Sequence, residues 1–337
     1  MTIRPLNRIA CLLAFCCFWN SGLTSKAEVN GPITEFVVPT EGAWPQAIVT
    51  GSDGNLWCVE SRKRKVIRIT PKGEITEYSV PGDKVLLLQS ITSGADGNLW
   101  FTSPSDNTIR RISPQGEFNG EFKIPTISPR SPKQDTSWPR GIVTGPDGNV
   151  WFAELYGNKI ARLTPKGEFT EFPLPTPDCG PYFPAFDKTG KVWFCESLAG
   201  KIGRLDPATG KIDEFPLPNA QCLPRDMTTG PDGNLWFSEN KADSIGRITL
   251  TGELTEFPVP QGSRPVGITA GPDGNIWFSG FGSSKIGRLT MEGKVTMLDI
   301  PTAKAQPFGL TVGPDGNLWF AGQARLIGKL DLKAVGK

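Results

Sequence analysis

A tryptophan-centred phrase recurs seven times along the chain, and this repeat limits the possible fold more than any other feature. Successive tryptophans are separated by 43, 51, 42, 43, 41 and 42 residues. Six copies place Asp-Gly-Asn two residues before the tryptophan, and the fourth copy is degenerate. Units of about 42 residues are typical of β-propeller blades. The seven tryptophans are Trp57, Trp100, Trp151, Trp193, Trp236, Trp277 and Trp319.

Each unit is predicted to form four short strands. In the third unit, residues 141–144 and 150–153 flank a Pro-Asp-Gly-Asn turn, as in a β-hairpin. Residues 159–163 alternate with period two, and residues 169–172 close the unit before a proline-rich exit. The sequence therefore predicts an all-β, seven-bladed β-propeller with four-stranded antiparallel blades.

The two ends of the chain are predicted to close the ring together. The last unit ends at Leu332 without a fourth strand. Residues 33–39 have the same form as residues 254–260, which supply the fourth strand of an earlier unit. We therefore expect the N-terminal strand to complete the last blade, so that no half-sheet has an exposed edge.

The repeated residues themselves are expected to be structural. Seven indoles at one blade position predict a buried core. The Asp-Gly-Asn phrase invites a calcium interpretation, but a calcium loop needs several more oxygen ligands, and Gly and Asn are what a tight hairpin requires.

Residues 1–27 are predicted to be a signal peptide. Arg4 and Arg8 precede an apolar run over residues 9–19, and Ser25-Lys26-Ala27 forms a small-x-small cleavage site. The apolar run is too short to span a bilayer, so we expect no membrane insertion after cleavage. The prediction is a secreted or periplasmic protein cut after Ala27, with residues 28–337 as a single domain.

Charge and composition exclude several classes of protein. Without the leader the chain has 33 basic and 34 acidic residues, which gives no reason to expect nucleic acid as a partner. The chain contains no histidine, so histidine nucleophile triads, histidine bases and histidine metal sites are all excluded. A closed propeller needs no partner chain, and we expect a monomer.

Four cysteines remain after the leader is removed, and two of them occupy the same position in adjacent units. Cys179 and Cys222 each precede an inner strand by a few residues. A disulfide between these neighbouring loops is a hypothesis, since an exported protein meets an oxidising compartment.

Three phrases together resemble the virginiamycin B lyase (streptogramin lyase) family. They are Gly-Pro-Asp-Gly-Asn-Leu-Trp-Phe at 230–237, Lys-Ile-Gly-Arg-Leu at 285–289 and Thr-Glu-Phe-Pro-Leu-Pro at 170–175. The resemblance covers nearly all of residues 31–332 and implies a seven-bladed propeller. It also implies an activity, the Mg²⁺-assisted elimination that opens the ester ring of streptogramin B antibiotics.

The positions at which this family carries its catalytic groups do not hold those groups here. The resemblance implies two histidines and two glutamates, which fall on Val266, Phe308, Gln306 and Gly322. None of these side chains carries a histidine or glutamate group. We therefore assign no catalytic residue.

Two rings of residues are predicted to line the mouth of the central channel. The first ring contains Gln46, Arg140, Tyr182, Arg225 and Phe308, and we expect Arg140 to meet Glu154 and Arg225 to meet Glu239. These pairs are either structural or part of a ligand site in which the arginines bind an anion. Trp44 and Trp138 are predicted to add stacking surfaces, with the long insertion before Trp138 as a tolerated loop in the alternative interpretation.

The sequence leaves three functions open. The first is a non-catalytic binding module for a small-molecule, glycan or protein ligand at the channel mouth. The second is a lyase or lactonase that uses Mg²⁺ or Ca²⁺ held by Glu154, Glu196 and Glu239. The third is a scaffold that binds partners through the faces of its blades.

Overall fold

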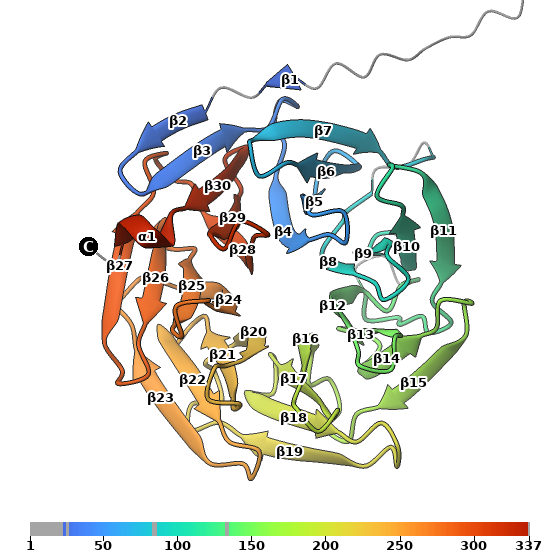
Figure 1. Cartoon of the computed structure of the whole chain (residues 1–337). Helices are drawn as coiled ribbons and strands as arrows, with labels where there is room; N and C mark the ends of the chain where they lie inside the picture. The colour runs from blue at the N-terminus through green and yellow to red at the C-terminus, as the bar shows by residue number, and fades with distance from the viewer. Residues whose placement is uncertain (1–22, 25–26, 83–85, 132–134, 336–337) are drawn as a thin grey trace, which may run out of the picture.

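Seven sheets, each built on a four-stranded blade, are arranged around a central axis in the computed structural model, which describes residues 23–24, 27–82, 86–131 and 135–335 (Figure 1). An added strand extends two of these sheets to five strands. The predicted seven-bladed β-propeller with antiparallel blades is confirmed. Neighbouring inner strands lie side by side around the ring, and the last one, β28, contacts the first one, β4. No helix among the described ranges is long and apolar enough to cross a membrane.

Every blade contributes one strand to each of four concentric layers. The inner strands are β4 (Pro45–Thr50), β8 (Ile91–Ser93), β12 (Pro139–Thr144), β16 (Pro181–Phe186), β20 (Pro224–Thr229), β24 (Pro265–Ala270) and β28 (Pro307–Val312). The second strands are β5 (Leu56–Glu60), β9 (Leu99–Ser103), β13 (Val150–Glu154), β17 (Val192–Glu196), β21 (Leu235–Glu239), β25 (Ile276–Gly280) and β29 (Leu318–Gly322).

The two outer layers follow the same order. The third strands are β6 (Lys65–Ile69), β10 (Thr108–Ile112), β14 (Lys159–Leu163), β18 (Lys201–Leu205), β22 (Ser244–Ile248), β26 (Lys285–Leu289) and β30 (Leu326–Leu330). The fourth strands are β7 (Glu74–Ser79), β11 (Phe118–Lys123), β15 (Phe169–Pro173), β19 (Ile212–Pro216), β23 (Leu254–Pro258), β27 (Val295–Asp299) and β3 (Ile33–Val37).

The N-terminal strand closes the ring as the sequence predicts. β3 pairs antiparallel with β30, with Ile33 opposite Leu330 and Val37 opposite Leu326. A further strand, β2 (Ala27–Asn30), pairs with β3, and β1 (Leu23–Thr24) pairs with β7 of the first blade. Most of the predicted signal peptide, residues 1–22 and 25–26, lies outside the described residues. A short helix, α1 (Leu332–Val335), follows the last strand.

The repeated tryptophans form the core, as predicted, and the repeated turns hold them. All seven indoles are at most 1% exposed. In blade 5, Trp236 Nε1 donates to Asp232 Oδ1 at 2.9 Å, and the backbone N–H of Asn234 donates to the same carboxylate. The intervening Gly233 has φ +76°, a conformation that favours glycine. The aspartate oxygens therefore serve the turn, which agrees with its predicted structural role.

The degenerate fourth blade lacks the aspartate of the repeated turn, and an aspartate at a different position takes its role. Its turn reads Thr-Gly-Lys, and Trp193 Nε1 donates at 2.8 Å to Asp187, six residues earlier instead of four. The same bond is thus made by every blade, because a buried indole N–H needs an acceptor.

The first hairpin of the blades has an irregular register that decides which side chains face the channel. In blade 3, Pro139 lies opposite Glu154, and the register then shifts before Ile142 pairs with Phe152. The same shift follows the inner-strand proline of the other blades except the second. Because successive strand residues point to opposite faces, Arg140 and Glu154 are placed on different sides of the blade.

Candidate functional site

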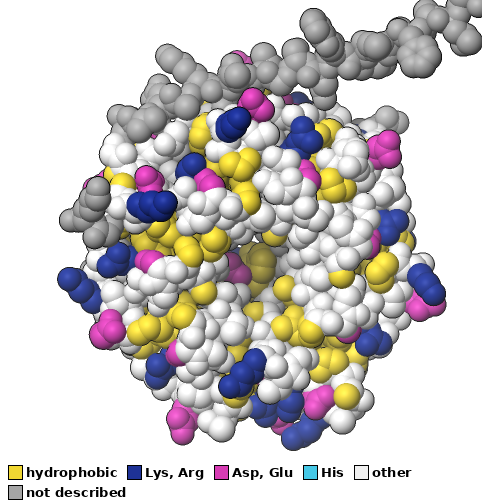
Figure 2. Space-filling model, viewed as in Figure 1, with side chains coloured by type: hydrophobic (Ala, Val, Ile, Leu, Met, Phe, Trp, Pro, Cys, Tyr) yellow, Lys and Arg dark blue, Asp and Glu magenta, His cyan; other side chains and the backbone are white. Residues whose placement is uncertain are grey.

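The centre of the ring is hollowed, with hydrophobic and acidic side chains visible at the bottom of the hollow (Figure 2). The cavity there has a volume of about 70 Å³, which suits small groups or a few water molecules. Its walls come from the inner strands of six blades. The lining residues are Ala47, Ile48, Ser90, Ile91, Tyr182, Phe183, Arg225, Asp226, Val266, Phe308, Gly309 and Leu310.

A second cavity of about 110 Å³ adjoins the first over blades 5 to 7. The two cavities share Arg225, Val266 and Phe308, and we call them together the mouth site. Phe281 adds an apolar wall, since its ring meets Phe308 edge to face with centroids 6.3 Å apart. The remaining lining residues of this part are Asn240 and Arg264.

Two arginines enclose a buried tyrosine beside the mouth site. Arg225 Nη1 donates to Tyr182 Oη at 2.8 Å, and Arg140 Nη1 donates to Gln89 Oε1 at 2.8 Å. Both guanidinium groups lie over the Tyr182 ring, at 4.8 Å for Arg225 and 5.0 Å for Arg140. Burial alone raises the pKa of Tyr182, but the positive charges of Arg140 and Arg225 outweigh it and the pKa is lowered overall.

The predicted Arg140–Glu154 and Arg225–Glu239 ion pairs are wrong. None of the ion pairs among the described residues includes Arg140 or Arg225. The hairpin register explains the error, because the residue opposite each glutamate is the proline before the arginine. A shift of one residue moves a side chain to the other face of the sheet.

The glutamates of the second strands lie inside their own blades. A Cβ added at Gly203 on β18 would come within 2.9 Å of Glu196 Oε1, so this carboxyl lies over the third strand and away from the channel. Burial, followed by the negative charge of Glu214 on β19, raises the pKa of Glu196 to about 7. Burial likewise raises the pKa of Glu239 to about 7 and that of Glu154 well above its ordinary value.

The predicted cation site formed by Glu154, Glu196 and Glu239 is therefore not assembled. Within the described ranges, no group of three or more His, Cys, Asp or Glu side chains is placed to hold a metal ion. The Mg²⁺ that the family resemblance implies also lacks a ligand set, because Val266, Phe308 and Gly322 carry no donor atoms in their side chains and the amide oxygen of Gln306 is the one donor at the four implied positions.

The predicted disulfide is also wrong. Cys179 and Cys222 are both free and buried. The Cys179 thiol lies beside the carboxyl of Glu196, and the Cys222 thiol lies beside that of Glu239. Each cysteine thus packs within its own blade, in the place where Ser137 accompanies Glu154 in blade 3.

Asp226 is a site residue that the sequence analysis missed. It follows Arg225 on β20 and is the only carboxylate among the described residues that line the central cavity. Its oxygens accept the backbone N–H groups of Met227 at 2.9 Å and Ile268 at 3.2 Å, and burial raises its pKa to about 7. The corresponding residues of the other blades, Ala47, Ser90, Gly141, Phe183, Gly267 and Gly309, carry no charge. The sequence did contain a signal for this residue, because Asp226 is the one acidic residue at this position of the aligned blades.

The other predicted ligand residues are distributed unevenly around the mouth. Tyr182, Arg225 and Phe308 line it, whereas Gln46 is nearly buried at 9% exposure. Trp44 lies in a separate groove, where the Arg62 guanidinium stacks on its ring and Gln306 forms part of the wall.

Trp138 follows the alternative interpretation of the insertion. Its ring packs edge to face on Tyr156 with centroids 6.1 Å apart, and it lies against the core of blades 4 and 5. It contacts neither cavity of the mouth site. Residues 132–134 of the same insertion lie outside the described part of the chain.

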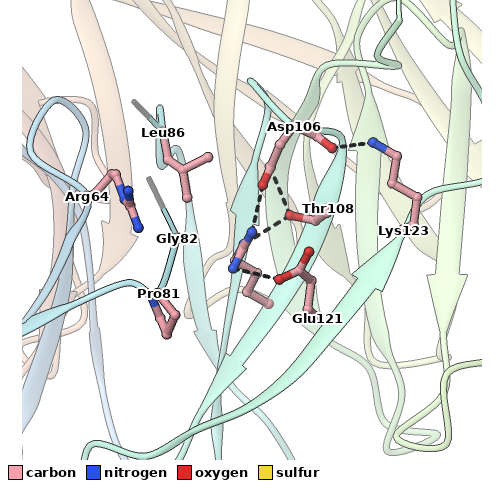
Figure 3. Close-up of a pocket in the computed structure, with 9 residues that line it drawn as sticks. Arg64, Pro81, Gly82, Leu86, Asp106, Thr108, Glu121 and Lys123 are labelled. Carbon is pink, nitrogen blue, oxygen red and sulfur yellow. Dashed lines mark hydrogen bonds and ion pairs between the residues drawn. The ribbon is translucent and has the colours of Figure 1, made fainter. Parts of the chain in front are cut away.

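A larger cavity of about 440 Å³ lies where blade 1 meets blade 2 (Figure 3). Most of its charged side chains satisfy one another, since Arg110 binds Asp106 at 2.7 Å and Glu121 at 2.9 Å, and Lys123 binds the backbone carbonyl of Asp106. The remaining cation, Arg64, donates to the backbone carbonyl of Val80. Residues 83–85 next to it are not described. This cavity is therefore not a candidate for the functional site.

The fold and the mouth site define a seven-bladed β-propeller with two small adjoining cavities among its inner strands. The chain belongs to the virginiamycin B lyase family, whose model matches residues 20–131 and 130–335. A crystal structure of a catalytically inactive histidine-to-alanine variant of virginiamycin B lyase from Staphylococcus aureus, with quinupristin, superimposes with a TM-score of 0.82. That match has 35% identity and covers 90% of this chain and 100% of the other.

Curated relatives match over shorter stretches. Virginiamycin B lyase from Nocardia farcinica is 31% identical over 163 residues, which cover 47% of this chain and 50% of that protein. The enzyme from Bordetella pertussis is 49% identical over 41 residues, 12% of this chain and 14% of that protein. These alignments span half or less of the relatives' length. The WD40 propeller of Doa1, 13% identical with a TM-score of 0.67, shares the fold alone.

Proposed function

We propose that this chain is an exported, non-catalytic member of the lyase family that binds a ligand at the mouth site. The observation that carries the proposal is the replacement of ionisable groups in the mouth by Val266 and Phe308, in a chain without a single histidine. In the Staphylococcus aureus relative, a variant that has lost one histidine is catalytically inactive.

The geometry supports binding more than chemistry. The mouth offers guanidinium groups, a tyrosine and three phenylalanines, which suit recognition of charge and apolar surface. The lyase or lactonase alternative depended on a glutamate cluster in the channel, and those glutamates lie inside the blades. Asp226 is the remaining acid through which such an activity would have to act.

The test is incubation of the purified protein with a streptogramin B antibiotic and Mg²⁺, followed by chromatographic separation of ring-opened product. An active virginiamycin B lyase is the positive control. We expect no product. Metal-dependent ring opening that disappears in Asp226→Asn and persists in the matched turn variant Asp232→Asn would show that the chain is an enzyme.

Export is supported by the leader over residues 1–27. The expected result is a mature protein whose N-terminal sequence begins at Glu28. Recovery of the uncut chain from the cytoplasm would contradict export without affecting the binding proposal.

A further inference from the structure

The residues around the mouth site carry a net positive charge, although the chain as a whole is nearly neutral. The whole chain is close to neutral, with 36 basic and 34 acidic residues. Arg225 and Arg264 nevertheless line the mouth site, while Arg62 and Arg325 line the neighbouring groove by Trp44. Asp226 is the one acid among the residues that line these three cavities.

None of these arginines has an acidic partner within the described part of the chain, and the same is true of Arg140. One N–H group of Arg225 is used on Tyr182 Oη, and the guanidinium has five in total. A planar guanidinium with free N–H groups at a cavity wall matches the two oxygens of a carboxylate. The charge of the mouth is therefore available to an anion.

The other half of the mouth is apolar. Val266, Phe281 and Phe308 form one wall of the cavity that also contains Arg225 and Arg264. The edge-to-face pair of Phe281 and Phe308 presents ring surface of the kind on which another aromatic ring packs.

The polar groups of the mouth do not favour the other ligand classes. Divalent cations are repelled by the arginines. A sugar is bound through several hydrogen bonds, and the Nδ2 of Asn240, the amide side chain that lines the mouth site, already donates to the backbone carbonyls of Arg264 and Pro265. Charge and apolar surface remain as the two features a ligand can use.

We infer that the ligand is an aromatic carboxylate. Its anionic group binds Arg225 and Arg264, and its ring packs against Phe281 and Phe308. This inference rests on the proposed function and adds the chemical class of the ligand.

The test compares three probes by titration calorimetry with the purified full chain. Phenylacetate carries ring and charge, phenylacetamide carries the ring alone, and acetate carries the charge alone. We expect phenylacetate to bind with a Kd on the order of 1 mM, as suits so small a ligand. The two partial probes are expected to bind at least tenfold more weakly, since each lacks one of the two contacts.

Three variants locate the binding. Arg225→Gln and Phe308→Ala should each weaken phenylacetate binding about tenfold, whereas Arg247→Gln, on the outer part of blade 5, should leave it unchanged. Thermal melting checks that each variant is folded, and the comparison of probes on the unaltered protein does not depend on any variant.

The possible failures are distinguishable. Equal binding of phenylacetate and phenylacetamide, both lost in Phe308→Ala, would overturn the anionic class and leave binding at the mouth intact. Equal loss in Arg225→Gln and Arg247→Gln, or no binding of phenylacetate, would also overturn the inference. Turnover of a streptogramin B would instead overturn the proposed function.

Discussion

Arginines in the blades and arginines at the mouth make the same contact with an aromatic ring, but their charges are balanced differently. Four of the five blade arginines that lie over a tryptophan also bind an aspartate, and Arg288 over Trp277 is the exception among the described residues, whereas Arg140 and Arg225 at the mouth both lack an acidic partner there. Arg204 lies over Trp193 at 5.2 Å and binds Asp213 at 2.6 Å. Arg225 lies over Tyr182 at 4.8 Å and has no such acid. Other blade arginines with both a tryptophan and an aspartate are Arg111, Arg162 and Arg247.

The difference separates structural charge from charge available for binding. A paired arginine on a buried ring belongs to the repeat and recurs from blade to blade. Cation–π contact alone leaves the guanidinium N–H groups free for a further partner. The mouth therefore repeats the arginine–ring contact of the blades but leaves guanidinium N–H groups available to bind an anion.

The largest expected effect on stability comes from changing the aromatic side chain that an arginine covers, once in a blade and once at the mouth. Trp236→Ala should lower the free energy of unfolding by about 3–5 kcal/mol, because it empties a fully buried core position. Tyr182→Phe removes only the hydroxyl that Arg225 binds and should cost about 1 kcal/mol. Urea denaturation measures both. Similar losses in the two variants would show that the mouth is as structural as the blades.

The second test concerns the acids buried in the blades. Glu196 has a pKa raised by burial from 4.5 to about 7, so the folded state holds its proton more tightly than the unfolded state. Below about pH 4.5 both states are protonated and nothing is lost. Stability falls as the pH rises from 4.5 to 7, and above pH 7 the loss is roughly 3 kcal/mol.

Glu196→Gln should remove this part of the pH dependence. Denaturation between pH 5 and pH 8 measures it, and the free energy of unfolding of the variant should fall less over that range than that of the unaltered protein. Asp315→Asn is the control, because the pKa of Asp315 is lowered by its bonds to Lys329, Trp319 and Asn317 despite partial burial, and Asp315 is not among the groups that shift the pKa of Glu196. Parallel curves for the unaltered protein and Glu196→Gln would contradict the buried, protonated state.

The smallest expected effect comes from the arginines themselves. Arg247→Gln removes a partly exposed ion pair with Asp232 and should cost below about 1 kcal/mol. Arg225→Gln should also cost below about 1 kcal/mol, because the lost hydrogen bond to Tyr182 is partly offset by the removal of a charge without a counter-charge. The difference in melting temperature between the two variants is the measurement. A larger loss in Arg225→Gln would mean that this arginine holds the channel together.

The fold could be predicted well from the sequence because each blade repeats the same residues at the same spacing. The spacing of the tryptophans defined the blades, and the likeness of residues 33–39 to residues 254–260 predicted the closing strand. Even the degenerate fourth blade keeps the bond to its tryptophan, through Asp187. Because the blades repeat, a strand or turn assigned in one blade can be checked against the equivalent residues of the others.

The site was predicted less well for two physical reasons. Counting residues placed Arg140 beside Glu154, but the irregular hairpin pairs Glu154 with Pro139, and one residue of register separates the two faces of a strand. Asp226 was missed for the opposite reason, since it occurs in one blade only and an alignment of repeats emphasises what the blades share. Arg225 and Phe308 were predicted correctly as mouth residues.

The closing strand also sets an order of events during synthesis. Residues Ile33–Val37 are made long before their partners Leu326–Leu330. Blade 7 cannot form before Leu326–Leu330 have left the ribosome, and until then β3 lacks its partner in that blade. The ring therefore closes in a late step, and the mouth is complete only once β30 has been made.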